Sequence, residues 1–155
     1  MNKIKILTVG SVKEEFLRNK INELRRKTER SGKNKVEIIE VPDESIPENA
    51  SEAVIEKIKN IEGKKLLSKI EAKDYVIALC IDGKPTTNED MNRLMDRAFS
   101  NYFTSVVYVI GGSLGLSDEV VKRADYRLSF SNMTFPHQLM RVMLLEAISD
   151  VCRKA

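Results

Sequence analysis

Two side chains near the carboxyl end of the chain have the types and spacing that acid–base chemistry requires. His137 is the single histidine, and imidazole is the side chain whose unperturbed pKa lies closest to neutrality. Arg141 follows one helical turn later on an otherwise apolar stretch. A charge there needs a partner, and a phosphate, a substrate base or Glu146 would serve. His137 can accept or relay a proton, or it can act only as a hydrogen-bonded positioning residue.

Two loops rich in glycine or polar residues precede this pair. Segment 111–115, Gly-Gly-Ser-Leu-Gly, follows a β-branched and aromatic run, and segment 130–135, Phe-Ser-Asn-Met-Thr-Phe, follows a second short run. Glycine lets backbone groups approach a ligand closely, although a tight turn is the simpler interpretation. The pattern is neither the dinucleotide fingerprint nor a Walker-type loop. Two strand ends that open into loops at one sheet edge predict a small-molecule crevice.

These segments also carry a family pattern. Its matching pieces are Ile110–Gly112 with Gly115–Ser117, Leu128–Phe135, Pro-His-Gln-Leu-Met-Arg at 136–141, Glu146 and, more weakly, Leu79–Lys84. The string at 134–141 is rare and supplies most of the specificity. On these residues, and over nearly its whole length, the chain closely resembles the bacterial ribosomal RNA large subunit methyltransferase H family. That family comprises 23S rRNA pseudouridine N3-methyltransferases of the SPOUT superfamily. Its members usually continue into a tail rich in His, Pro and Tyr, whereas this sequence ends at Ala155.

The resemblance implies S-adenosyl-L-methionine as the cofactor. The cofactor-binding residues that it implies are Leu79, Gly111, Phe130, Ser131, Asn132, Met133, Thr134 and Phe135. Without the resemblance, several of these are ordinary core residues, and Thr134 is a helix cap before a proline in the first helical turn. Transfer of a sulfonium methyl group depends strongly on positioning, and the N3 proton of pseudouridine must leave. We expect the catalytic residues His137 and Arg141 to share this work, as a base and as a cation facing the developing anion.

The alternation of strand-like and helix-like segments predicts an α/β fold, with a mainly parallel sheet and helices on both faces. The expected strands cover 3–10, 36–41, 75–81, 104–110 and 126–130, and the expected helices cover 12–30, 51–70, 87–99, a short segment from 117, and 136–152. Ser51 and Thr87 are expected helix caps, Gly63 is expected to weaken its helix, and 82–85 is expected to form a turn. Residues 1–155 are expected to form one domain.

Composition places the chain among ordinary globular proteins. Apolar residues make up 42% and charged residues 32%, with a net charge of +3. No apolar run approaches the roughly 20 residues of a membrane span, and the amino terminus does not have the pattern of a signal peptide. Cys80 and Cys152 have neither Cys-x-x-Cys nor metal-ligand spacing. Free thiols in a reducing cytoplasm, and no metal site, are the expectation.

Charge is unevenly distributed along the first part of the chain. Residues 13–35 hold nine basic and four acidic side chains, a local charge of +5, whereas residues 37–62 hold eight acidic and two basic ones, a local charge of −6. Such a division can orient a molecule on a phosphate-rich surface, and we expect the basic segment to contact an RNA backbone. Two solvated helix faces of opposite sign are the alternative.

The last expected helix is apolar on nearly all sides. A helix of this kind is buried on more than one side, which in a short chain predicts either a second subunit, most simply in a two-fold homodimer, or a central position in a monomer. The resemblance implies the homodimer, with the cofactor pocket beside its interface. It also implies a C-terminal trefoil knot, which topology rules alone would exclude.

The leading hypothesis is therefore a cytoplasmic enzyme. It would methylate N3 of a pseudouridine in helix 69 of 23S rRNA (position 1915 type), with S-adenosyl-L-methionine as donor, on assembled 70S ribosomes. The alternative is a non-catalytic α/β dimer that binds a nucleotide or a ribosomal surface. A flavodoxin-like binder of another phosphate ligand is less favoured, because acidic or hydroxyl-rich loops do not follow several strands.

Overall fold

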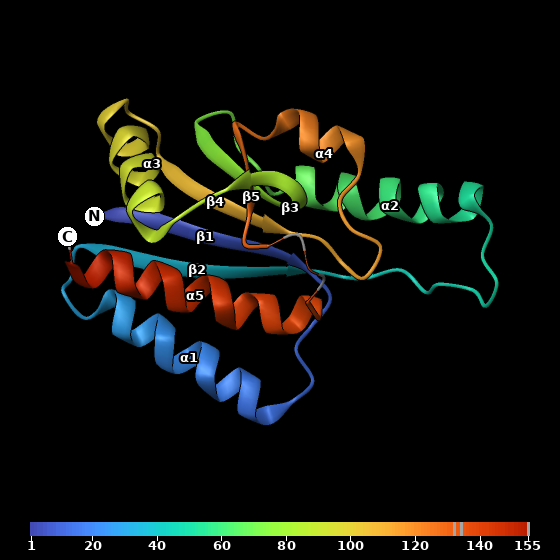
Figure 1. Ribbon diagram of the computed structural model, residues 1–155, viewed down its shortest axis with the longest axis horizontal. Coiled ribbons are helices and arrows are strands. Elements are labelled where there is room, and N and C mark those ends of the chain that lie inside the picture. Colours follow the sequence, from blue (N-terminus) through green and yellow to red (C-terminus); the bar gives the residue numbers. More distant parts are fainter. Residues whose placement is uncertain (132, 134, 155) are drawn as a thin grey trace.

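The computed structural model contains one five-stranded parallel sheet in the order β2-β1-β4-β3-β5 (Figure 1). It describes residues 1–131, 133 and 135–154. The strands are β1 (Asn2–Val9), β2 (Asn34–Val41), β3 (Asp74–Pro85), β4 (Ser105–Ile110) and β5 (Tyr126–Ser129). The helices are α1 (Glu15–Glu29), α2 (Glu52–Leu67), α3 (Asn88–Ser100), α4 (Asp118–Arg123) and α5 (His137–Lys154). The predicted α/β class with a parallel sheet is confirmed, and the trefoil knot stays a prediction.

Helices cover both faces of the sheet, because alternate strand residues point to opposite sides. Ile4 and Ile6 of β1 join the apolar core under α1, α3 and α5, whereas Leu7 and Val9 join a second core with α2 and α4. All six residues of β4 are buried. This two-sided burial explains why the central strands are nearly continuous apolar runs.

Helix α5 lies beside α1 on one face of the sheet (Figure 1). Its residues Leu144, Leu145 and Ile148 are fully buried in the core of the same chain. Leu139 is 37% exposed, and Val142 and Met143 are partly exposed. One side of the apolar helix is therefore covered within the chain, and an apolar stripe remains on the other side.

The expected turn at 82–85 is wrong, because β3 continues to Pro85. Leu128 of β5 is opposite both Leu79 and Lys84, so the intervening residues of β3 form an irregularity in the ladder. Gly83 permits this arrangement, since a Cβ at that position would lie only 2.9 Å from the carbonyl oxygen of Arg127. A local sequence typical of a turn is thus held in the sheet by a close approach of two backbones.

Gly63 also has a packing role, although glycine is a poor helix former. Helix α2 passes through it without interruption, contrary to the expected weakening, and a Cβ there would lie 2.2 Å from Ser117 Oγ. The glycine lets α2 approach the start of α4 closely. The predicted cap Ser51 is confirmed, since its hydroxyl oxygen accepts a hydrogen bond from the Val54 amide.

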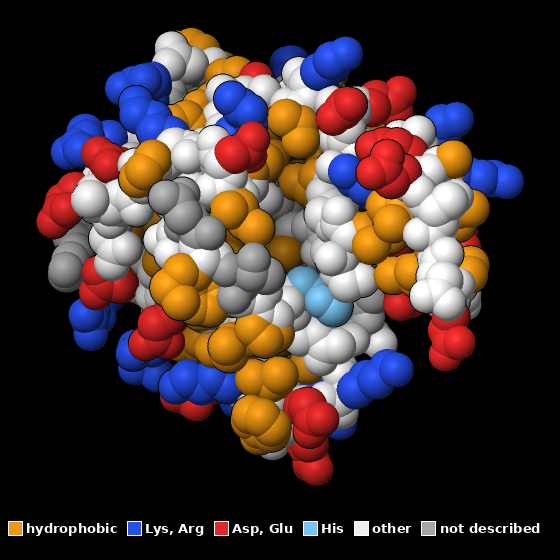
Figure 2. Space-filling model, turned by 45° about the vertical axis from the view of Figure 1, so that its right-hand side comes forward, with side chains coloured by type: hydrophobic (Ala, Val, Ile, Leu, Met, Phe, Trp, Pro, Cys, Tyr) orange, Lys and Arg blue, Asp and Glu red, His pale blue; other side chains and the backbone are white. Residues whose placement is uncertain are grey.

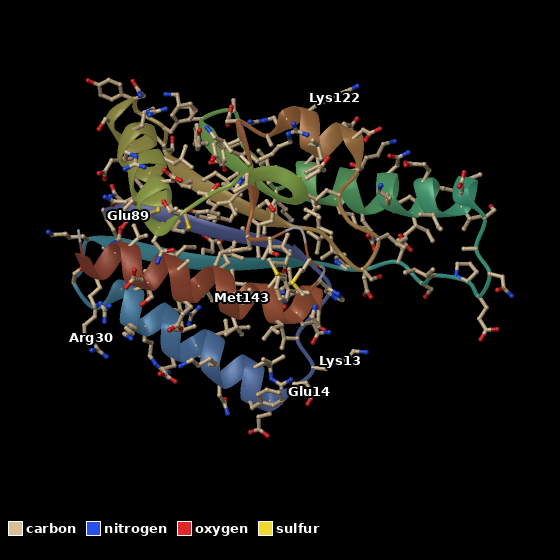
Figure 3. All side chains as sticks on the ribbon, viewed as in Figure 1. Lys13, Glu14, Arg30, Glu89, Lys122 and Met143 are labelled. Atoms are coloured by element: carbon tan, nitrogen blue, oxygen red, sulfur yellow. The ribbon has the colours of Figure 1, made fainter. Side chains whose placement is uncertain are left out.

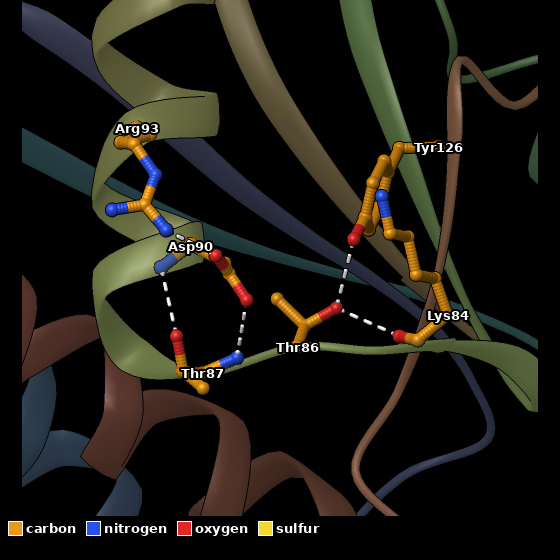
Figure 4. Close-up of polar contacts among 6 residues, drawn as sticks. All are labelled: Lys84, Thr86, Thr87, Asp90, Arg93 and Tyr126. Atoms are coloured by element: carbon orange, nitrogen blue, oxygen red, sulfur yellow. Dashed lines mark hydrogen bonds and ion pairs between the residues drawn. The ribbon is translucent and has the colours of Figure 1, made fainter.

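Thr87 and Asp90 form the capping box expected at the start of α3 (Figure 4). The Asp90 amide donates to Thr87 Oγ1 at 3.1 Å, and the Thr87 amide donates to Asp90 Oδ2 at 3.0 Å. The preceding Thr86 hydroxyl lies 3.0 Å from the Tyr126 hydroxyl, which connects the β3–α3 junction to β5. No helix in the described part of the chain has the length and apolar character needed to cross a membrane.

Candidate active site

A cavity of about 730 Å³ opens at the carboxyl ends of β4 and β5, beside residues 79–81 of β3 and the start of α5. Its volume is within the usual range for small-molecule sites. Of the residues expected to form the site, the cavity brings together Leu79, Gly111, Phe130, Ser131, Met133, Phe135 and His137. The predicted Asn132 and Thr134 lie outside the described residues. Figure 2 shows the histidine beside a hollow with hydrophobic side chains around it.

The glycine loop after β4 forms one wall through its backbone. A Cβ at Gly111 would lie 2.7 Å from the carbonyl carbon of Gly115, so a larger residue would displace the loop. The Gly115 amide donates to the Gly112 carbonyl at 3.0 Å, and Gly115 has a φ of +87°. Main-chain groups are consequently at the cavity surface, where side chains would otherwise cover them.

The loop after β5 forms the opposite wall. Ser129 Oγ lies 2.9 Å from the carbonyl oxygen of Ile81 and 3.1 Å from that of Ser131, which ties this loop to β3. The Met133 amide donates to Ser131 Oγ at 3.0 Å. The Met133 side chain is 68% exposed, so it is not a core residue but part of the cavity rim.

His137 is the first residue of α5 and lines the cavity. Burial lowers the pKa of its imidazole, and the positive charge of Arg141 lowers it further, while Asp43 and Glu62 act in the opposite direction. The net shift is downward, so the ring is neutral at physiological pH. A neutral imidazole at the cavity surface is able to accept a proton.

Arg141 is 2% exposed and is not among the cavity-lining residues that the structure describes. Its guanidinium donates to Glu40 Oε2 at 2.5 Å and to the carbonyl oxygens of Val9 and Gly10 at 3.0 and 2.8 Å. The carboxylate partner is therefore Glu40, whereas Glu146, one of the three partners considered above, is exposed. Arg141 joins the start of α5 to the carboxyl ends of β1 and β2.

Glu62 is a buried carboxylate near this network that sequence reasoning missed. It is 5% exposed, its Oε2 accepts the Glu44 amide at 3.0 Å, and its Oε1 would contact a Cβ at Gly112 at 3.3 Å. Its position within a strongly acidic segment gave no signal that distinguished it. Ile81 and Met140 were also missed as cavity residues, although Ile81 ends the apolar run of β3.

Comparison with known proteins gives this site a family context. Residues 2–151 match the protein family described as "Predicted SPOUT methyltransferase". The chain belongs to the SPOUT methyltransferase family.

Two bacterial relatives of this SPOUT methyltransferase carry the name "Ribosomal RNA large subunit methyltransferase H". The protein from Clostridioides difficile is 51% identical over 145 residues, covering 94% of this chain and 90% of that protein. The protein from Streptococcus agalactiae is 44% identical over 146 residues, covering 94% and 91%. The predicted resemblance is confirmed.

A solved structure, a probable methyltransferase from Bordetella pertussis, supports the fold. It matches with a TM-score of 0.56 and 10% identity, over 97% of this chain and 95% of that one. At this identity the likeness concerns the fold alone.

A SPOUT methyltransferase requires a methyl donor, and the cavity fits a ligand of that kind. Apolar walls from Leu79, Leu116 and Phe130, together with the open backbone of Gly111, leave room for a small-molecule donor. Among the described residues, no group of three or more His, Cys, Asp or Glu side chains is arranged to hold a metal ion.

Proposed function

We propose that this SPOUT methyltransferase transfers a methyl group to N3 of a pseudouridine in helix 69 of 23S rRNA, within assembled 70S ribosomes in the cytoplasm. The observation that carries the proposal is the meeting of the glycine loop and His137 in one cavity of a chain whose relatives are named ribosomal RNA large subunit methyltransferase H. S-adenosyl-L-methionine, when bound, supplies an electrophilic methyl group on a sulfonium.

The chain's own residues would perform binding and proton transfer. Gly111 and the loop formed by Phe130 to Phe135 would orient the donor between them, and the apolar side chains around them would exclude water. His137, kept neutral by burial and by Arg141, would accept or relay the N3 proton as the new N–C bond forms. Removal of this proton makes N3 a better nucleophile.

Arg141 would act through its neighbours. Its guanidinium is occupied by Glu40 and two carbonyl oxygens, so we assign it a positioning role at the start of α5. Its charge would also keep the pKa of His137 low. In this proposal Arg141 does not contact the substrate. It contributes through its charge and by holding the start of α5 in place.

A homodimer through α5 is part of the proposal. The partly exposed side chains of Leu139, Val142 and Met143 form an apolar stripe beside the cavity, and a second copy would cover it. Analytical ultracentrifugation tests this point, and a Leu139→Asp variant is expected to shift the chain toward monomer. A wild-type protein that sediments as a monomer at high micromolar concentration contradicts the dimer.

The decisive assay uses 70S ribosomes from a strain that lacks the modification. Incubation with the protein and labelled S-adenosyl-L-methionine is expected to place label in one pseudouridine of 23S rRNA, located by nuclease digestion and mass spectrometry. Separated subunits and free 23S rRNA serve as alternative substrates. Calorimetry with the donor alone distinguishes an enzyme that rejects this RNA from a protein that binds no donor.

A further inference from the structure

Four basic side chains form a cluster at the carboxyl end of α1. This basic cluster consists of Arg26, Lys27, Arg30 and Lys33, all of which are exposed. The salt bridges found among the described residues include none of these four. With Glu29 included, residues 26–33 carry a net charge of +3, which produces a concentrated positive potential.

The neighbouring acidic groups are already engaged. Glu23 pairs with Lys20 at 3.5 Å, and Glu29 Oε2 accepts the backbone amide of Val36 at 2.8 Å. Cations at the carboxyl end of a helix interact favourably with the helix dipole, and each stabilises the helix by about 0.3–1 kcal/mol. Because Arg26 and Lys27 already occupy the last turn, the two further cations that follow make the cluster larger than that effect requires.

The basic cluster lies at the opposite edge of the sheet from the cavity. The Asn2 amide donates to the Lys33 carbonyl at 2.8 Å, so the end of the cluster adjoins the first residue of β1. In Figure 3, Arg30 lies at this end of α1, whereas Lys13 and Glu14 lie at the end near the start of α5. At about 3.3 Å per residue, the eight residues of β1 separate the cluster from the cavity edge by about 25 Å.

Exposed carboxylates lie at the other edge of the sheet. The loop between β2 and α2 carries the exposed residues Asp43 and Glu48, and exposed Glu52 begins α2. Lys13 also lies at that end of α1 (Figure 3), so acidic and basic side chains are mixed there. A polyanion would therefore be attracted more strongly by the basic cluster at the amino edge of the sheet.

We propose that the basic cluster binds the phosphate backbone of the RNA substrate about 25 Å from the nucleotide that enters the cavity. This inference rests on the proposed function, since it names the surface that holds the same RNA. Remote phosphate contacts fix orientation without reading bases. Such a contact would hold the RNA while the target base enters the cavity that His137 lines.

The test replaces all four cations by glutamine, which removes the charge and keeps a polar side chain at each position. The Michaelis constant for 70S ribosomes is expected to rise at least tenfold at about 0.1 M salt, with kcat within twofold and donor affinity unchanged. The slope of log affinity against log salt should become shallower by about 3, at roughly 0.7–0.9 per phosphate contact.

A matched control removes the same charge from another surface. Lys57, Lys64, Lys69 and Lys73 lie on α2 or shortly after it, are exposed, and have no salt bridge among those found in the described residues. Their quadruple glutamine variant should keep the wild-type salt slope. Equal effects of the two variants, or an unchanged slope for the cluster variant, would overturn the proposal.

Binding and methylation measurements distinguish failure of this inference from failure of the proposed function. Filter retention of ribosomes measures binding without turnover, so it reports on the basic cluster even when no methylation occurs. Absent methylation by the wild-type protein would contradict the proposed function instead. If circular dichroism shows that the quadruple variant is unfolded, the pairs Arg26→Gln/Lys27→Gln and Arg30→Gln/Lys33→Gln each carry the test, with an expected change in slope of about 1.5.

Discussion

Arg141 and Glu40 are joined by a 2.5 Å ion pair across 101 residues of sequence, and the arginine is far more buried than its partner, at 2% against 41% side-chain exposure. This difference in burial determines how much each side chain contributes to the stability of the fold. Glu40 can be solvated without the arginine, whereas the carbonyl oxygens of Val9 and Gly10 lose a charged donor in the interior.

We therefore expect Arg141→Met to lower the free energy of unfolding by about 2–4 kcal/mol, because two carbonyl groups lose their charged donor. Glu40→Gln keeps an acceptor oxygen and the two carbonyl contacts but leaves the buried guanidinium without its counter-charge, so it should cost less than Arg141→Met, about 1–2 kcal/mol. Urea denaturation of both variants provides the comparison. Equal losses would mean that the ion pair, and not the carbonyl contacts, supplies the stability.

His137→Ala is expected to reduce kcat by about 10²- to 10⁴-fold, the usual range for loss of a general base. Donor affinity, measured by calorimetry, should change by less than threefold, because the glycine loop and the apolar walls remain. His137→Gln keeps a hydrogen-bonding group without a titrating one, and so distinguishes positioning from proton transfer. Near-normal turnover in the glutamine variant would assign His137 a positioning role.

The pH profile follows from the lowered pKa of His137. Above the ordinary value of 6.5 the imidazole is neutral in both folded and unfolded chains, so kcat/KM should be flat through neutrality. As pH falls through the lowered pKa, the ring gains a proton and activity declines, with a midpoint below 6.5. Because the pKa of His137 is lower in the folded state, the unfolded chain binds the proton more readily. The free energy of unfolding therefore decreases as pH falls below the pKa of His137 in the unfolded chain. A midpoint above 6.5 would contradict the environment described.

Gly111→Ala tests the loop that we propose faces the donor. The added Cβ would lie within 3 Å of the Gly115 backbone, so the loop must move. We expect at least tenfold weaker donor binding together with a loss of stability, because the clash is with backbone atoms at a buried position. Gly32→Ala is a useful comparison, since that residue has a φ of +76° and no neighbour within 4 Å; it should lose stability and keep donor affinity.

Tyr108 and Tyr126 allow the effect of a tyrosine hydroxyl group on stability to be compared with and without a hydrogen-bond partner. The Tyr108 hydroxyl is buried and has no hydrogen-bond partner among the described residues, and burial raises its pKa. The Tyr126 hydroxyl lies 3.0 Å from Thr86 Oγ1. Tyr108→Phe should therefore be neutral or stabilising by up to about 1 kcal/mol, while Tyr126→Phe should cost about 0.5–1.5 kcal/mol. Thermal unfolding of the two variants decides the sign.

The fold was largely predictable because its determinants are local or periodic. Alternating strand and helix patterns identified the sheet, and Ser51 and Thr87 marked helix starts through short-range hydrogen bonds. Predictions failed where a distant part of the chain decided the outcome. Gly83 resembles a turn residue until β5 approaches it, and Gly63 resembles a helix breaker until Ser117 packs against it.

The candidate site was predicted mainly from the family resemblance. His137 was also singled out by its residue type, whereas the glycine loop alone was consistent with a simple tight turn. The cavity brings the two together, and their roles stay predictions. The surroundings of Arg141 were not predicted, because Glu40 and the carbonyl groups of Val9 and Gly10 lie more than 100 residues earlier in the chain. Nothing in the spacing of Arg141 on its helix specifies that long-range arrangement. Its placement away from the cavity therefore required the structure.

The late position of α5 in the chain has a consequence for biosynthesis. The cavity needs β3 and β4 from the middle of the chain, yet it is closed by His137 and Met140, which are translated near the end. Contacts between α5 and α1 join segments more than 100 residues apart, and such long loops close slowly. A growing chain therefore lacks part of the cavity lining until α5 has been translated.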